Sequence, residues 1–92
     1  MNTLDTRMAE LARRFAARAG EERAGLSQAL AAGNGKAVRD RAHKLAGIAA
    51  MFGYPEIGEA ALALEIAAEN GEDLSVAARE LDDRLAELDP AD

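Results

Sequence analysis

The sequence has no cysteine and no tryptophan, and only 3% of its 92 residues are aromatic. Without cysteine there is no disulfide, no thiol nucleophile and no cysteine-ligated zinc site, and a single histidine leaves too few strong ligands for a metal. No apolar run approaches the roughly 18–20 residues that span a bilayer, and no basic segment followed by an apolar one marks a secretory signal. These absences predict a soluble, cytoplasmic protein.

The balance of charge is acidic, with 11 basic and 17 acidic side chains and a net charge of −6. Nucleic acid is therefore not expected as a partner, because binding to phosphates requires a basic surface. Between Gly35 and Gly53 the balance reverses: four cations stand against Asp40 alone, which gives +3 and leaves −9 for the rest of the chain. This basic island surrounds His43, the one histidine, and its cations are Lys36, Arg39, Arg41 and Lys44.

Strong helix formers dominate the composition, whereas the β-branched residues that favour sheets are few. Apolar residues recur at steps of three, four or seven in four segments, over about residues 3–32, 35–51, 55–69 and 74–88. The loops between these segments are very short, which forces successive helices to run antiparallel. The sequence therefore predicts a single all-α domain over residues 1–92, built as an up-down antiparallel four-helix bundle.

Residues that begin or end helices separate the four segments. Asn34 and Asp73 are expected to cap the second and last helices, and Pro55 to occupy the first position of the third. Gly20 interrupts the first segment, where we expect a bend or break because an interior glycine costs about 1 kcal/mol relative to alanine. The expected terminators are Gly33, Gly53, Gly71 and Pro90.

A helix turns about 100° per residue, so the side chains of the second helix can be placed around His43. Lys36, Arg39, Gly47 and Ala50 fall within about 40° of the imidazole, and Asp40 and Ala46 within about 60°. The residues on the opposite side are apolar: Val38, Leu45, Ile48, Ala49 and Phe52. His43 is therefore predicted to face water while this apolar stripe faces the bundle.

The neighbours of His43 are short or basic. Gly47 destabilises a helix interior and becomes understandable if another molecule must approach the ring closely. Arg39 and Lys36, one and two turns before the histidine, are placed to attract an anion, whereas Lys44 lies about 100° away and is a flanking charge. Neutral imidazole is a good nucleophile near pH 7, so an exposed ring in a basic setting can accept a phosphoryl group and pass it on.

The block AHKLAGIAAMFG, followed by PEIGEAALALE, resembles the histidine-containing phosphotransfer (HPt) domains of multistep phosphorelays. The usual pattern of that family is Ala-His-x-Leu-Lys-Gly, then a glycine six residues later, then a helix that ends in Leu-Glu. His43, Leu45, Gly47 and Gly53 fall in register with it, and Leu64-Glu65 closes the block.

The resemblance implies that His43 takes a phosphoryl group on Nε2 from a receiver-domain aspartyl phosphate, or from a histidine kinase, and passes it to another receiver aspartate. The receiver would supply Mg²⁺, so no cofactor is expected on this chain. Lys36, Arg39, Gly47 and Lys44 are assigned to the phosphoryl environment, and Asp40, Ala46 and Ala50 to partner docking. The chain has no phosphate-binding glycine loop and no room for an ATP-binding domain, which predicts a carrier rather than a kinase.

The sequence departs from the family at Ala46, where a lysine is common. Arg39 is a better candidate than Lys44 to replace that lysine, because it shares the face of the histidine. The departure keeps open a non-catalytic helical adaptor that binds a receiver or another partner through this face. A dimer seam is a weaker alternative to the expected monomer. Asp40 either orients the ring or is simply solvated, and the compact ends favour a free-standing protein.

Overall fold

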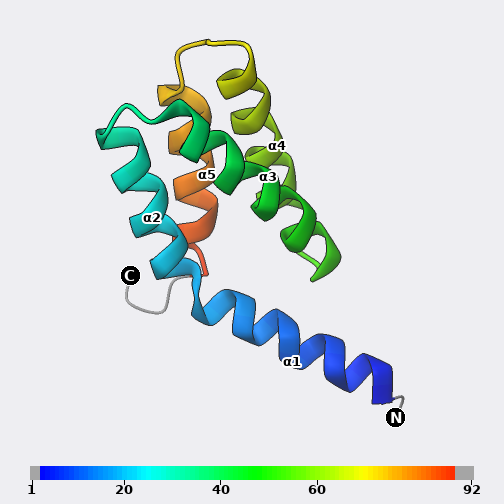
Figure 1. Ribbon diagram of the computed structural model, residues 1–92. Coiled ribbons are helices and arrows are strands. Elements are labelled where there is room, and N and C mark those ends of the chain that lie inside the picture. Colours follow the sequence, from blue (N-terminus) through cyan, green and yellow to red (C-terminus); the bar gives the residue numbers. More distant parts are fainter. Residues whose placement is uncertain (1–2, 89–92) are drawn as a thin grey trace.

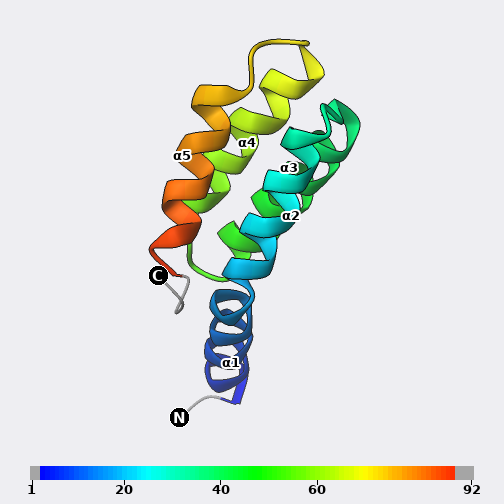
Figure 2. The ribbon, with the colours of Figure 1, turned by 90° about the vertical axis from the view of Figure 1, so that its left-hand side faces the viewer.

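The computed structural model describes residues 3–88, and every regular element in that range is an α-helix (Figure 1). The helices are α1 (Thr3–Ala17), α2 (Ala19–Ala31), α3 (Gly35–Met51), α4 (Pro55–Glu69) and α5 (Ser75–Ala86). Helices α2 to α5 lie side by side, whereas α1 extends away from the end of α2 (Figure 2). The predicted all-α class is confirmed. The predicted four helices are not, because the described chain has a fifth.

The extra helix arises because the first predicted segment is divided at Arg18, two residues before Gly20. At Arg18 the backbone N–H bonds to the carbonyl of Phe15, a three-residue step that tightens the turn. Phe15 is buried, and its ring stacks on Tyr54 at 5.5 Å and meets Phe52 edge-on at 6.3 Å. This aromatic contact accompanies the break, so local glycine propensity did not decide its position.

The helices of the bundle alternate in direction and are joined by the short segments 32–34, 52–54 and 70–74 (Figure 1). Each of the four packs against two others: α3 on α4, α4 on α5, α5 on α2 and α2 on α3. Their apolar stripes meet in a core whose largest fully buried side chains are Leu26, Val38, Leu64, Leu81 and Leu85. Among residues 3–88, no helix is long and apolar enough to cross a membrane.

Two of the predicted helix starts are confirmed, and the third is displaced by one residue. Asn34 caps α3, since its side chain accepts a hydrogen bond of 3.0 Å from the N–H of Ala37, and α4 begins at Pro55. Asp73 lies one residue before the cap position of α5, where its carboxylate accepts the backbone N–H of Ser75 at 2.8 Å. Hydrogen bonds from the hydroxyl and backbone of Ser75 lower the pKa of Asp73.

Two of the predicted terminators show why glycine stands there. Gly33 and Gly53 have φ of +66° and +88°, in the left-handed region that side chains with a Cβ rarely adopt. Both therefore end a helix and let the chain reverse, and the turn at Gly53 aligns α4 against α3. Pro90, the fourth predicted terminator, lies outside the described residues.

The core predicts a contrast between two leucines of α4. Leu64 is fully buried and Leu62 is 49% exposed. Leu64→Ala should lower the free energy of unfolding by about 2–5 kcal/mol, because it leaves a cavity among packed side chains. Leu62→Ala should cost under about 0.5 kcal/mol. Urea unfolding followed by circular dichroism measures both, and equal losses would contradict the described packing.

Candidate functional site

His43 lies in the middle of α3 on the side that faces away from the core. Its side chain is 73% exposed, while Val38, Ala42, Leu45 and Ala49 of the same helix are buried. The imidazole is therefore open to solvent and to another molecule. Gly47, one turn further along, is exposed too, and a Cβ built on it meets no atom within 4 Å.

The imidazole has a partner on the neighbouring helix. Nδ1 of His43 lies 2.8 Å from Oε2 of Glu65 in α4, and the Glu65 side chain is only 14% exposed. An ionised carboxylate can only accept a hydrogen bond, so the geometry assigns the ring proton to Nδ1. The lone pair is then on Nε2, the other ring nitrogen, which has the character of a nucleophile.

Close packing of α3 on α4 brings these two side chains together. Gly58 of α4 is buried against α3, and a Cβ there would lie 3.3 Å from the carbonyl oxygen of Ala46 and 3.4 Å from Cβ of Ala50. The distance to the carbonyl oxygen is tighter than most Cβ contacts, so a side chain at position 58 would require the two helices to shift by a few tenths of an ångström. Glu65, two turns along α4 from Gly58, then reaches His43 from α4.

Lys36 and Arg39, the predicted cations, both pair with Asp40. Nζ of Lys36 lies 3.1 Å from one carboxylate oxygen, and the guanidinium of Arg39 donates to the other at 3.2 and 3.4 Å. Hydrogen bonds from Lys36 and then Arg39 lower the pKa of Asp40. Asp40 therefore neither stands alone in solvent nor supplies the partner of Nδ1, which is Glu65.

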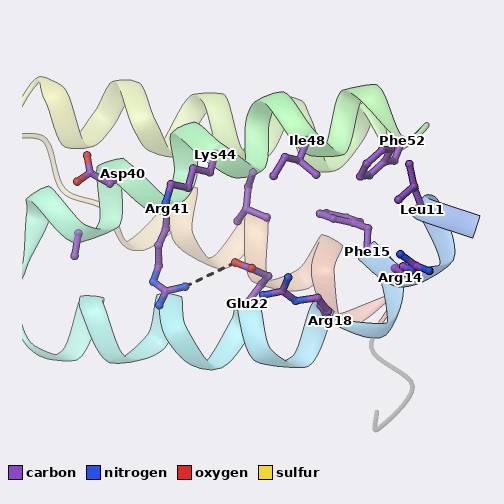
Figure 3. Close-up of a pocket in the computed structure, with 12 residues that line it drawn as sticks. Leu11, Arg14, Phe15, Arg18, Glu22, Asp40, Arg41, Lys44, Ile48 and Phe52 are labelled. Atoms are coloured by element: carbon purple, nitrogen blue, oxygen red, sulfur yellow. Dashed lines mark ion pairs between the residues drawn. The ribbon is translucent and has the colours of Figure 1, made fainter. Parts of the chain in front are cut away.

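The remaining predicted residues divide between two sides of α3. Ala46 is half-buried where α4 crosses, and Ala50 is exposed beyond it. Lys44 is exposed and points toward a groove of about 730 Å³ that lies between α3 and the α1–α2 junction (Figure 3). Lys44 therefore flanks His43 from the groove side.

The apolar floor of this groove contains one residue that the periodicity misplaced. Ile48 was predicted to face the bundle, but it is 41% exposed and lines the groove with Leu11, Phe15 and Phe52 (Figure 3). Because α1 turns away at Arg18, this part of α3 borders an open groove instead of packing fully against α1. At the other end of the groove, Arg41 reaches Glu22 of α2 at 3.7 Å.

The family model described as "Hpt domain" matches residues 10–91. No curated protein and no solved structure matches the chain. Across the described residues there is no cluster of three or more histidine, cysteine or acidic side chains that could hold a metal ion.

Sequence reasoning missed the role of Glu65. It noted the residue as the end of the family block, but helical periodicity places side chains within one helix and does not say which residue of another helix they meet. A glutamate beside the buried Leu64 was the available signal, since an acidic group near a core needs a partner.

The contact with Glu65 predicts the tautomer of the imidazole. In the native protein, ¹⁵N chemical shifts should show a protonated Nδ1 and a bare Nε2 whenever the ring is neutral. Glu65→Ala removes the acceptor and should move the proton toward Nε2, as in a free side chain. Glu69→Ala, at an exposed glutamate one turn further along α4, is the matched control and should leave the shifts of His43 unchanged. A native ring with its proton on Nε2 would contradict the hydrogen bond.

Proposed function

The chain belongs to the Hpt domain family, whose members are histidine phosphocarrier modules of phosphorelays, and on that premise we propose that His43 is its phosphoryl acceptor. The donor is either a receiver domain, through its aspartyl phosphate, or a histidine kinase. An aspartate of a second receiver then accepts the phosphoryl group. The observation that carries the proposal is an exposed imidazole whose Nδ1 is held by the carboxylate of Glu65, which leaves Nε2 free to react.

The transfer is a displacement at phosphorus. The lone pair of His43 Nε2 forms the new bond to phosphorus as the bond from phosphorus to the aspartate oxygen breaks, and that electron pair stays on the aspartate. The proton on Nδ1 remains, so the phosphorylated ring becomes a cation. The carboxylate of Glu65 neutralises this new charge at a partly buried position, where an opposite charge has its largest effect. Transfer to the next receiver reverses these steps.

The surroundings of His43 suit a large partner. Gly47 and Ala50 are short and exposed, so a receiver can bring its aspartate up to Nε2 along this side of α3. Mg²⁺ comes with the receiver in this proposal, and the chain itself holds no cofactor. Asp40, Ala46 and Lys44 border the docking surface. We expect the carrier to act as a cytoplasmic monomer.

The negative charge of a phosphohistidine is stabilised by a nearby cation. This chain has Ala46 at the position where the family commonly has a lysine. Arg39 is the proposed substitute: it lies one turn before His43, and residues four apart on a helix lie close enough for their side chains to interact. Lys36 stands one turn further and adds a weaker attraction. The alternative function is an adaptor that binds a receiver through the same face without transfer, which Ala46 motivates.

The acceptor is tested by isotope labelling. Incubated with a phosphorylated receiver, the native protein should gain acid-labile phosphate, and His43→Gln should gain none while it keeps the native circular dichroism spectrum. Arg79→Gln, at an exposed position of α5, which does not pack against α3, is the control that should still label. Equal labelling of the native and His43→Gln proteins would refute the acceptor. Receiver binding that persists in His43→Gln, with no transfer to the native protein, would favour the adaptor.

Gly47 gives a second test, because stability and function should move in opposite directions. Gly47→Ala fills open space in a helix, so it should raise the free energy of unfolding by about 0.5–1 kcal/mol. The added methyl group should hold a receiver off and slow its transfer to His43 by about 10- to 100-fold. Labelling by phosphoramidate, a small phosphoryl donor, should be unaffected. Unchanged transfer from the receiver would contradict the clearance assigned to Gly47.

A further inference from the structure

Asp40 occupies a position that the proposed chemistry does not explain. It lies one turn before His43 on the same helix, so it places a negative charge close to where a phosphoryl group would be attached. Like charges at this spacing repel, which by itself makes Asp40 unfavourable beside phosphohistidine.

The contacts of Asp40 link it to the cations near His43. One oxygen accepts from Lys36 and the other from Arg39, the same two cations that lie on the face of the histidine. The side chain of Lys36 is 78% exposed, that of Asp40 48% and that of Arg39 41%. Ion pairs this exposed are weak, so either cation can leave Asp40 for another anion. A doubly charged phosphoryl group would compete with the single charge of Asp40 for Arg39.

We propose that Asp40 is a positioning residue that holds Arg39 away from Nε2 and thereby limits how strongly the chain binds its own phosphoryl group. The inference rests on the proposed phosphorylation of His43. While the carboxylate holds the guanidinium, the phosphorylated ring is less stabilised and gives its group to the next aspartate more readily. No covalent bond forms or breaks in this exchange, because only the hydrogen bonds of Arg39 move from one anion to another.

The charged groups around the site define what the experiment must separate. On α3 they are Lys36, Arg39, Asp40 and Lys44, and the contact from α4 is Glu65. Replacing Asp40 by asparagine keeps the size of the side chain and removes its charge. Both consequences, release of Arg39 and loss of repulsion, favour the dianionic form of a phosphoryl group on His43. The second pKa of that group should therefore fall.

The measurement needs no partner protein. His43 is phosphorylated with phosphoramidate, and the ³¹P shift of the phosphohistidine is followed against pH. In Asp40→Asn the second phosphoryl pKa should fall by about 0.3–0.7 pH unit, a two- to fivefold change typical of one exposed charge pair. The change should shrink in 1 M salt, where the screening length is only about 3 Å.

A second substitution isolates the role of Arg39. In an Arg39→Gln background, the effect of Asp40→Asn should fall to half or less, because no guanidinium remains to be released. Asp83→Asn removes the same charge from the exposed face of α5 and should leave the phosphoryl pKa unchanged. With a receiver present, Asp40→Asn should also shift the equilibrium about three- to tenfold toward phosphohistidine.

Each outcome has a distinct meaning. A phosphoryl pKa equal to the native one in Asp40→Asn overturns the inference and leaves His43 as the acceptor. An undiminished effect in the Arg39→Gln background also overturns it, because Asp40 then acts by its own charge and not by positioning Arg39. A native protein that phosphoramidate cannot label at His43 overturns the proposed function together with the inference.

Discussion

The site depends on how closely α3 and α4 approach. Gly58 has no side chain where α4 crosses Ala46 and Ala50, and the backbones can therefore come near enough for Glu65 to reach His43. A larger residue at position 58 would move α4 away from α3. The hydrogen bond to Nδ1 would then lengthen, although neither of its own residues had changed. The chemistry of the ring is thus fixed by the packing of small residues some distance along the helices.

The short side chains of α3 have two uses on two sides of one helix. Ala46 and one side of Ala50 lie against Gly58 of α4, while Gly47 and the exposed part of Ala50 leave the solvent side open. This accounts for a run of small residues that is otherwise a poor choice, since a glycine in a helix interior costs stability without any packing in return. On one side of the imidazole Glu65 contacts Nδ1, and in the proposed transfer Nε2 is the atom that reacts with a partner.

Much of this arrangement could be predicted from the sequence, because it follows from rules within one helix. Periodicity gave the all-α class and the buried stripe of α3, and the preference of asparagine for helix starts identified Asn34. The errors share one origin. The break at Arg18, the exposure of Ile48 and the partner of Nδ1 all depend on contacts between helices, which a single sequence does not specify.

The division of the first helix shows how such contacts overrule local preference. Glycine at position 20 is a good place to break a helix, yet the chain continues through it and turns at Arg18, next to the stack of Phe15 on Tyr54. In a sequence with only 3% aromatic residues, a cluster of three rings is a large share of the specific packing available. The cluster holds the junction of α1 and α2 against the end of α3, and the groove beside Ile48 follows from it.

A count of charges along the sequence does not show which of them pair with one another, and the structure supplies that information. The basic island carries +3 with Asp40 already counted, but its cations are not all free to act on His43, because Asp40 pairs with Lys36 and Arg39. Two carboxylates therefore have different partners: Glu65 contacts Nδ1 of the ring, and Asp40 pairs with Lys36 and Arg39. A carrier must bind its phosphoryl group well enough to take it and weakly enough to release it. In the proposed relay, the pairing of Lys36 and Arg39 with Asp40 limits how tightly the site would hold a phosphoryl group.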